Sequence, residues 1–444
     1  MKMMICKRAG INMLATLFLL LLPLLAFADE ALKQRLASLP QVTEVTEVKD
    51  MAGFESRYIL RFTQPLDHKD PSKGSFSQRV IVMNHGTNRP TLLVTEGYGA
   101  GYAAGSHYNN ELSQYFNTNI VFVEHRFFQE STPNPCQWDY MRDEEAMADL
   151  HEIVTALKTI YSGKWISTGI SKGGETCMEF RAFYPEDVDV SVPYVGPVCY
   201  GRIDGRHEPF LRKVGTAADR KIIENFQIAA LKRKAALMPR FKELCDKKGL
   251  KFYIPLEEVY DYCVLEYSFS IWQWGKKTTL IPEPTASDDV IFKELVGVVG
   301  PDYFSTTGDV SFFIQAYREL GYYGYDLKPF KPYLTIKSAK NYVRDVMLPP
   351  ELRHYKFDKT VSRRITKYLK ENDPQMICIY GEVDPWTAAG VTWLKDYKKD
   401  NIKVYIKPGG SHATRIANMP AEQRDEILST LSKWLGEPVV KKKL

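Results

Sequence analysis

The sequence predicts an α/β fold in which a mostly parallel sheet is covered by helices on both faces and interrupted by a helical insertion. Short apolar runs alternate with helix-like segments in the first half of the 444-residue chain. A pentapeptide of the form Gly-x-Ser-x-Gly lies between a strand signal and a helix signal. A long helix-rich stretch comes after it, and strand signals return only near the C-terminal end.

The first half of the chain supplies most of the expected sheet. Some of its segments are rich in β-branched and aromatic residues, and others are continuous apolar runs of the kind expected for buried parallel strands. One segment instead has apolar residues at helical spacing. The expected elements are strands at 58–62, 78–83, 91–95, 120–123, 164–168 and 188–195, and a helix over 144–161.

The pattern changes near Gly205, where helical periodicity replaces the alternation. Helices are expected over 217–246, 256–274, 311–320 and 361–369, and strand signals return at Met376. Because the chain must rejoin one sheet through short connections, we favour a helical cap inserted into that sheet. An independent second domain is the alternative. The expected division is a signal peptide at 1–28, a first core part at 29–204, a helical cap at 205–370 and a second core part at 371–444.

The N-terminus has the organisation of an export signal. Lys2, Lys7 and Arg8 precede an apolar run over 11–25, and Ala26-Phe27-Ala28 provides a small-x-small cleavage site. A membrane anchor is the alternative, but the run is short for the roughly 20 residues that a span needs. We therefore expect cleavage after residue 28 and an exported protein without stable membrane insertion. Whether it resides in the periplasm, on the cell surface or in the medium stays open.

Charge and cysteine content narrow the function classes. A net charge of +5 is only mildly basic, so nothing predicts a nucleic-acid partner. Of the seven cysteines, only Cys6 precedes the cleavage site, and an even number in an oxidising compartment permits disulfide bonds. Cys245 and Cys263 are the first candidate pair, whereas Cys378 lies in an apolar strand. The chain has no CxxC and no HExxH motif, so no metal or cofactor is expected.

The pentapeptide Gly169-Ile170-Ser171-Lys172-Gly173 has the sequence of a nucleophile elbow. In such a turn the serine takes a strained backbone conformation, and its hydroxyl projects above the sheet. The glycines allow the strand and the helix to approach closely. The pattern alone recurs by chance, so its weight depends on suitable partners later in the chain.

Two later segments supply an acid and a base. An apolar run over 377–383 ends at Asp384, and a run over 404–406 leads through a glycine-rich turn to His412. The order serine, acid, histidine is that of the α/β-hydrolases. A histidine can accept the serine proton while the acid holds the imidazole in place. The sequence therefore predicts a catalytic triad of Ser171, Asp384 and His412, the alternative being three unrelated turn and loop residues.

An oxyanion hole is expected beside this triad. The backbone N–H of Lys172 supplies one donor by the geometry of the elbow. The loop after the third core strand, Glu96-Gly97-Tyr98-Gly99, is expected to supply the second. Gly97 and Tyr98 are the residues that we assign to this role.

Distinctive segments are spread over nearly the whole mature chain. They are 64–68 (QPLDH), 123–128 (VEHRFF), 135–138 (PCQW), 163–174 (GKWISTGISKGG), 183–189 (FYPEDVD), 315–323 (QAYRELGYY), 384–386 (DPW) and 409–412 (GGSH). Together they resemble the secreted serine peptidases of the PS-10 type, which include bacterial prolyl tripeptidyl aminopeptidases. More distantly they resemble lysosomal prolyl carboxypeptidase and its dipeptidyl-peptidase relatives.

The resemblance implies cleavage near the amino terminus of peptides, often after proline. It implies a pocket whose aromatic faces stack on the pyrrolidine ring, with Trp386 at the matching position. Tyr322 and Tyr323 would close this pocket from the cap, and Gln315 begins the segment that these families use beside it. Aromatic core packing is the alternative for both tyrosines.

An aminopeptidase must also recognise a free ammonium group, which calls for a partly buried carboxylate. The candidates are Glu96, Glu124, Glu175 and Glu319. Glu124 has an alternative role in a structural ion pair with Arg126. Glu175 departs from the resemblance, because relatives usually carry an apolar residue at this position of the proline pocket. Dependence on proline therefore stays open.

These observations predict an exported serine exopeptidase that releases short fragments, expected to be tripeptides, from peptides with free N-termini. A secreted carboxylic-ester hydrolase of the same fold is one alternative. A catalytically silent binding protein with a hydrolase fold is another. The oligomeric state stays open.

Overall fold

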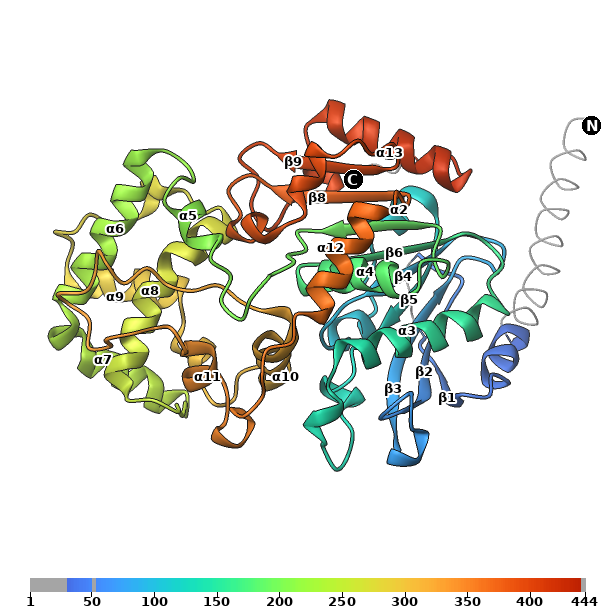
Figure 1. Cartoon of the computed structure of the whole chain (residues 1–444), viewed down its shortest axis with the longest axis horizontal. Coiled ribbons are helices and arrows are strands. Elements are labelled where there is room, and N and C mark those ends of the chain that lie inside the picture. The colour runs from blue at the N-terminus through green and yellow to red at the C-terminus, as the bar shows by residue number, and fades with distance from the viewer. Residues whose placement is uncertain (1–29, 50–52, 441–444) are drawn as a thin grey trace, which may run out of the picture.

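The computed structural model describes residues 30–49 and 53–440. The predicted signal peptide at 1–28 and the C-terminal lysines 441–443 lie outside the described residues. Within the described ranges, nine strands form one mixed sheet in the order β1-β2-β3-β5-β4-β6-β7-β8-β9 (Figure 1). Their bounds are β1 Val42–Glu47, β2 Ser56–Pro65, β3 Ser75–Asn84, β4 Thr91–Thr95, β5 Asn119–Val123, β6 Trp165–Ile170, β7 Val190–Tyr194, β8 Met376–Gly381 and β9 Ile402–Lys407.

The strand directions define a switch point in this sheet. β3 is antiparallel to β2 and to β5, whereas the strands from β5 across to β9 are parallel to one another. β4 lies between β5 and β6, so the chain leaves β4 toward one side and later returns on the other. Ligand sites in open α/β sheets form where the connections diverge in this way, outside the carboxyl ends of the strands.

The burial of the strands explains which of them could be predicted from the sequence. Every residue of β4, β5, β7 and β8 is buried, as expected for parallel strands that are covered on both faces. The edge strand β1 has no buried residue and was not predicted. The predicted mostly parallel sheet is confirmed.

Helices cover both faces of the sheet. On one face, side chains of α2 (Glu111–Phe116) and α13 (Ala421–Leu435) join the apolar core beneath the sheet. On the other face lie α3 (Asp143–Lys158), α4 (Lys172–Phe183) and α12 (Thr360–Glu371), in front of the sheet in Figure 1. This arrangement of helices and mixed sheet is the α/β-hydrolase fold.

The chain between β7 and β8 is helical. Figure 1 shows most of these helices gathered on one side of the molecule, beside the sheet. The expected helix over 256–274 is confirmed, whereas the stretch over 217–246 forms two helices that meet at Arg233. The helices are α5 His207–Leu211, α6 Ala217–Lys232, α7 Lys234–Lys247, α8 Leu256–Trp274, α9 Asp288–Val298, α10 Val310–Gln315 and α11 Tyr342–Met347.

The boundary of this helical part differs from the sequence division in one respect. α12 falls within the range 205–370 that was assigned to the cap. Its apolar residues share a core with α4 and with strand β8, so it covers the sheet. We use the name helical cap for residues 205–347, which contain α5 to α11.

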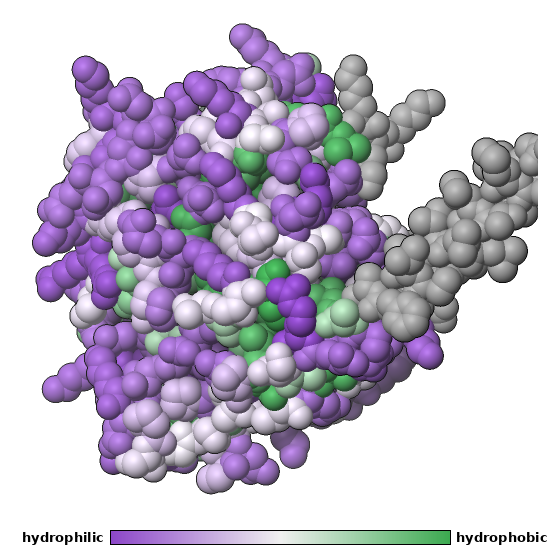
Figure 2. Space-filling model, turned by 90° about the vertical axis from the view of Figure 1, so that its right-hand side faces the viewer, coloured by the Kyte–Doolittle hydropathy of each residue, from purple (hydrophilic) through white to green (hydrophobic). Residues whose placement is uncertain are grey.

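Figure 2 shows that the end of the molecule facing away from the helical cap is largely hydrophilic, with hydrophobic residues only in small patches. Among the described residues, no helix has both the length and the apolar character needed to cross a bilayer. The described cysteines are all free thiols, so the predicted bridge between Cys245 and Cys263 is not formed. Burial raises the pKa of both thiols.

Candidate active site

The predicted elbow is a sharp turn between β6 and α4. Ser171 has φ 59° and ψ −121°, a conformation that is strained for a residue with a side chain. A β-carbon on Gly169 would collide with the carbonyl oxygen of Gly173. One on Gly173 would lie 2.5 Å from the carbonyl oxygen of Glu96. The two glycines are therefore required by close backbone contacts, and the loop after β4 lies directly against the elbow.

Asp384 and His412 follow neighbouring strands and form a buried pair. Asp384 comes after β8 and is completely buried, and His412 comes after β9 and is 5% exposed. The Nδ1 of His412 lies 2.7 Å from Oδ2 of Asp384. Because a carboxylate only accepts hydrogen bonds, Nδ1 is the donor, which leaves Nε2 free to accept a proton. The second carboxylate oxygen accepts from the backbone N–H of Trp386 at 3.1 Å.

The helical cap holds the histidine loop. The backbone N–H of His412 donates to the carbonyl of Gln273, in the last turn of α8, at 2.8 Å. The ring of Trp274 meets the His412 ring edge-on, with 5.8 Å between their centroids. Trp274 is 62% exposed, so it forms part of the outer surface next to the pair.

Ser171 opens into a cavity between the sheet and the helical cap. The cavity has a volume of about 470 Å³, within the range of small-ligand sites. Its lining combines the core residues Tyr98, Ser171 and Trp386 with residues of the cap. The cap contributes aromatic rings, several backbone segments and the carboxylates of Glu266, Asp302 and Asp309.

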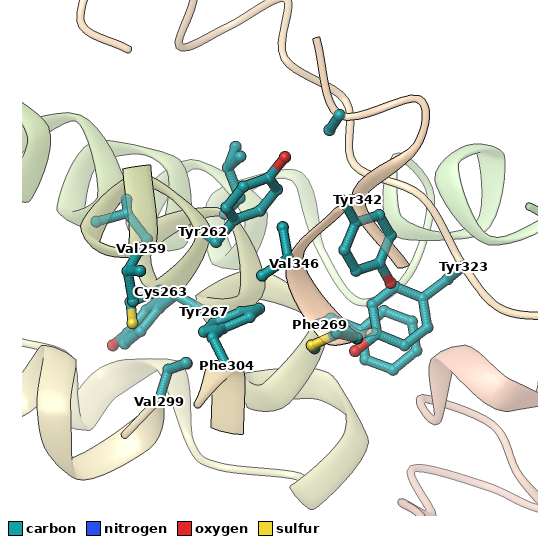
Figure 3. Packing of buried hydrophobic residues seen from close by; sticks show 14 of the residues in the cluster. Val259, Tyr262, Cys263, Tyr267, Phe269, Val299, Phe304, Tyr323, Tyr342 and Val346 are labelled. Carbon is teal, nitrogen blue, oxygen red and sulfur yellow. The ribbon is translucent and has the colours of Figure 1, made fainter. Parts of the chain in front are cut away.

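Aromatic rings enclose the part of the cavity near Trp386. Its ring centroid lies 5.3 Å from those of Tyr322 and Tyr323 and 5.4 Å from that of Phe269. Tyr323 stacks on Phe269 at 3.7 Å, and Figure 3 shows the two rings together with Tyr342 beside them. The predicted substrate residues Trp386, Tyr322 and Tyr323 thus lie together in the cavity wall.

The loop after β4 contributes a side chain as well as its backbone. The Tyr98 side chain lines the same cavity as Ser171, and its ring packs against Phe128 and Phe312. Burial raises the pKa of Tyr98 well above its usual value, so its hydroxyl stays protonated as a donor. Gly97 has φ 77°, and its carbonyl accepts from Nζ of Lys172 at 2.6 Å. The sequence had indicated only a backbone role for Tyr98.

Glu124 serves the fold beside the site. It forms a buried ion pair with Arg79 on β3, and it accepts from the backbone N–H of Ala100 at 2.7 Å. Arg126 instead pairs with Asp149 on α3, and its Nε and Nη2 each donate to one carboxylate oxygen at 2.7 Å. The alternative of a Glu124–Arg126 ion pair is therefore wrong, because the two side chains meet charges on different elements.

Two further predicted carboxylates, Glu96 and Glu319, lie outside the cavity lining. Glu96 accepts from the hydroxyl of Tyr102 at 2.7 Å, and burial raises its pKa to about 7. Glu319 accepts from the backbone N–H of Asp143 at 3.0 Å and pairs with Arg142 at 3.2 Å. Both carboxylates are thus held by partners of their own.

Glu175 belongs to a buried cluster behind the elbow. Asp143, Glu175 and Glu179 share this cluster with the ammonium of Lys172, and burial raises the pKa of all three carboxyls well above the usual range. Gln315 donates to Asp143 at 2.8 Å and contacts His125. Neither Glu175 nor Gln315 is among the residues that line the cavity.

Glu266 is the cavity residue that sequence reasoning missed. It lies in the middle of α8, where it is a single acid in the otherwise uncharged stretch 262–275. A lone acid inside an apolar helix is rarely buried without a purpose, and this was the available signal. Within the described ranges, no group of three or more His, Cys, Asp or Glu side chains is arranged to hold a metal ion.

The chain is similar to known peptidases over most of its length. The family described as PS-10 peptidase S37 matches residues 28–443. A prolyl tri/tetrapeptidyl aminopeptidase of Streptomyces mobaraensis is 29% identical over 418 residues, which cover 91% of this chain and 85% of that protein.

Solved structures of more distant proteins are also similar. A proline iminopeptidase of Mycobacterium smegmatis has 14% identity and a TM-score of 0.44, covering 84% of this chain and 98% of that one. An acetyl xylan esterase of Paenibacillus sp. R4 has 9% identity and a TM-score of 0.39, covering 91% of this chain and 93% of that one. The match to the family extends over nearly the full sequence, and the chain therefore belongs to the PS-10 peptidase S37 family of serine peptidases.

Proposed function

We propose that this serine peptidase is an exported exopeptidase that releases short N-terminal fragments from peptides, preferentially after proline. The single observation that carries this proposal is the buried hydrogen bond between His412 and Asp384, in a chain whose strained Ser171 lines a cavity beneath the helical cap. A charge-assisted bond of this kind keeps an imidazole oriented as a general base.

The chemistry is acyl transfer to serine. Nε2 of His412 takes the proton of the Ser171 hydroxyl as its oxygen attacks the scissile carbonyl carbon. The same proton then goes to the leaving amine, which departs with the downstream peptide. Water, deprotonated by His412, hydrolyses the acyl-enzyme and frees the N-terminal fragment.

Two donors stabilise the negative oxygen that forms during both steps. The backbone N–H of Lys172 is one, because it follows the nucleophile at the start of α4. We assign the second role to the hydroxyl of Tyr98, because it is a neutral donor on a residue that lines the same cavity as Ser171. Donors fixed in a closed site need no reorganisation as charge develops.

Substrate preference follows from the cavity walls. Trp386, Tyr322 and Tyr323 present ring faces and edges that suit the flat, apolar pyrrolidine ring of proline. A cavity of about 470 Å³ admits a chain end more readily than a folded protein. The name of the Streptomyces relative, a prolyl tri/tetrapeptidyl aminopeptidase, supports both features.

Export is part of the proposal. The basic residues, the apolar run and the small-x-small site within residues 1–28 support cleavage by a signal peptidase. The expected location is outside the cytoplasmic membrane. N-terminal sequencing of the mature protein from its source cells tests this step, and a chain that begins at Met1 would contradict it.

One experiment tests the catalytic proposal. A fluorophosphonate probe is expected to label the purified protein at Ser171, and Ser171→Ala is expected to abolish both labelling and turnover. Turnover is then measured with tripeptide p-nitroanilides that end in proline or alanine and with short-chain aryl esters. Cleavage of the proline anilide supports the proposal, whereas ester turnover without peptide turnover identifies an esterase. Absence of labelling in a folded protein identifies a silent binding protein.

A further inference from the structure

A buried carboxylate without a positive partner lies in the wall of the cavity that contains Ser171. Glu266 is 4% exposed and projects from α8 in the helical cap. In the part of the chain that the structure describes, its hydrogen-bond partners are three hydroxyls and no cation. Burying a charge in this way is costly unless a cation is supplied from elsewhere.

The three hydroxyls leave the carboxylate one acceptor position short of saturation. Oε2 accepts from Tyr323 at 2.9 Å and from Tyr325 at 2.8 Å, and Oε1 accepts from Ser270 at 3.1 Å. A carboxylate offers about four lone-pair positions, so one remains on Oε1. The hydroxyls fix the orientation of the group without neutralising it.

The cavity around Glu266 is suited to a cation. Among the described residues, no Lys, Arg or His lines it, whereas three carboxylates and several aromatic rings do. Aromatic faces attract cations, and they do so more strongly where water is excluded. A positively charged group of the substrate is therefore the partner that this wall lacks.

The other two carboxylates of the cavity already have partners. Asp302 is exposed and pairs with Lys248 at 2.9 Å. Asp309 is also exposed and caps α10 by accepting from the backbone N–H of Phe312 at 3.1 Å. Glu266 is the buried and unpaired member of the set.

One tyrosine connects Glu266 with the aromatic enclosure near the nucleophile. The ring centroid of Tyr323 lies 5.3 Å from that of Trp386, and its hydroxyl lies 2.9 Å from the Glu266 carboxylate. Joined through one phenol side chain, these contacts put the carboxylate within roughly 11 Å of the Trp386 ring, the reach of about three extended residues. Longer fragments would have to fold back on themselves to fit.

We propose that Glu266 binds the free α-ammonium group of the substrate and thereby sets the length of the released fragment at about three residues. This assignment rests on the proposed function, because it requires a proline-sized residue beside Trp386 and a scissile carbonyl at Ser171. Glu266 then determines specificity by position and charge and takes no part in the transfer of the acyl group.

The test compares two substrates that differ only in the amino group. Ala-Ala-Pro p-nitroanilide carries the ammonium, and propionyl-Ala-Pro p-nitroanilide lacks it but has the same length and shape. For the wild-type protein, kcat/KM is expected to be roughly 10- to 100-fold higher for the free amine, as for a hydrogen bond to a charged group. Glu266→Gln is expected to reduce this preference to about threefold or less, with hydrolysis of the propionyl substrate retained.

Variants of the other two cavity carboxylates show whether the preference for the free amine depends on Glu266 alone. Asp302→Asn removes a carboxylate from the same cavity and is expected to retain the preference for the free amine. A preference that survives in Glu266→Gln, or that is lost in Asp309→Asn instead, overturns the assignment. Wild-type protein that hydrolyses neither anilide contradicts the proposed function itself and not the role of Glu266 alone.

Folding of the variants is checked independently. The rate of fluorophosphonate labelling at Ser171 reports an intact elbow without an ammonium group. If Glu266→Gln does not fold, Glu266→Asp keeps the charge but withdraws it by one methylene group. This variant is expected to lose at least about threefold of the preference, as for a weakened bond to a charged group, and an unchanged preference overturns the assignment.

Discussion

Gly275, the left-handed residue that ends α8, lies directly against Ser411, the residue before His412. A β-carbon on Gly275 would approach that of Ser411 to 2.9 Å, closer than two such carbons normally come. Together with the hydrogen bond from His412 to Gln273, this contact joins the end of a cap helix to the histidine loop. The position of the imidazole therefore depends on the cap as well as on the sheet.

Gly275→Ala is expected to lower kcat by roughly tenfold to a hundredfold, because a small displacement of a catalytic group is costly. The matched control is Gly249→Ala. Gly249 has the same φ of +65°, but its β-carbon would meet nothing within 4 Å. Both variants are expected to lose about 1 kcal/mol of stability from the left-handed backbone. Equal kcat values in the two variants, measured with the proline anilide, would show that the contact does not position His412.

Asp384→Asn tests the buried acid. An amide of the same shape no longer holds the imidazole with Nδ1 as donor, so kcat is expected to fall by about 10⁴. Asp302→Asn, at an exposed cavity carboxylate, serves as the control for loss of charge. Steady-state kinetics and the labelling rate should fall together. A loss smaller than tenfold would remove Asp384 from the proposed triad.

Tyr98→Phe tests the second oxyanion donor. The ring contacts with Phe128 and Phe312 remain possible, and only the hydroxyl near Ser171 is removed. We expect kcat to decrease by about a hundredfold with little change in KM, as for the loss of one donor. Tyr102→Phe makes the same change four residues later, at a hydroxyl bonded to Glu96. The role of Tyr98 is refuted if the two variants have similar kcat values.

Much of the fold could be predicted because the relevant signals are local. The buried parallel strands β4, β5, β7 and β8 are largely apolar, and Ser171, Asp384 and His412 each follow a strand-like segment, at the edge where loops converge. Strand β1 was not predicted because an exposed edge strand needs no apolar face. The break at Arg233 was not predicted because this single residue separates α6 from α7, without glycine or proline at the junction.

The parts of the site that could not be predicted depend on contacts between distant segments. Glu124 pairs with Arg79 because β3 lies beside β5, and nothing in the local sequence distinguishes Arg79 from Arg126 as a partner. Glu175 follows the nucleophile by four residues, yet its side chain belongs to the cluster behind the elbow. Glu266 lies in the inserted helices, for which the sequence offered no catalytic motif.

Glu175→Gln links this placement to stability. Burial, reinforced by Asp143 and opposed by Lys172, raises the pKa of Glu175 well above its usual value. The folded state therefore binds more protons than the unfolded state above about pH 4.3, the ordinary pKa of a glutamate, so stability falls as pH rises. The variant is expected to lose less free energy of unfolding than the wild type between about pH 5 and pH 8. Urea denaturation at several pH values measures this.

Glu175→Gln also shows whether Glu175 contributes to substrate specificity or only to the stability of the fold. Because Glu175 does not line the cavity, the ratio of kcat/KM for proline and alanine anilides is expected to stay unchanged in Glu175→Gln. A clear shift of that ratio would mean that Glu175 reaches the substrate after all.

The pH dependence of substrate choice provides the last prediction. Burial raises the pKa of Glu266 to about 7, an effect that the hydroxyls of Tyr325, Tyr323 and Ser270 oppose. The tyrosines facing it, which also include Tyr303, Tyr322 and Tyr342, have raised pKa values and stay protonated in this range. Below about pH 7 Glu266 is therefore neutral in the free enzyme and attracts an ammonium group less strongly.

The ratio of kcat/KM for the free-amine and propionyl substrates isolates this titration, because His412 and Asp384 act equally on both. The ratio is expected to fall by up to about tenfold per pH unit below pH 7 and to decline again above about pH 8, where the substrate amine loses its proton. Glu266→Gln should flatten the acid side only, since the substrate still titrates. Asp302 and Asp309 also line the cavity, so their Asn variants are measured in parallel. A decrease of the ratio below pH 7 that persists in Glu266→Gln and disappears in Asp309→Asn would assign ammonium recognition to Asp309.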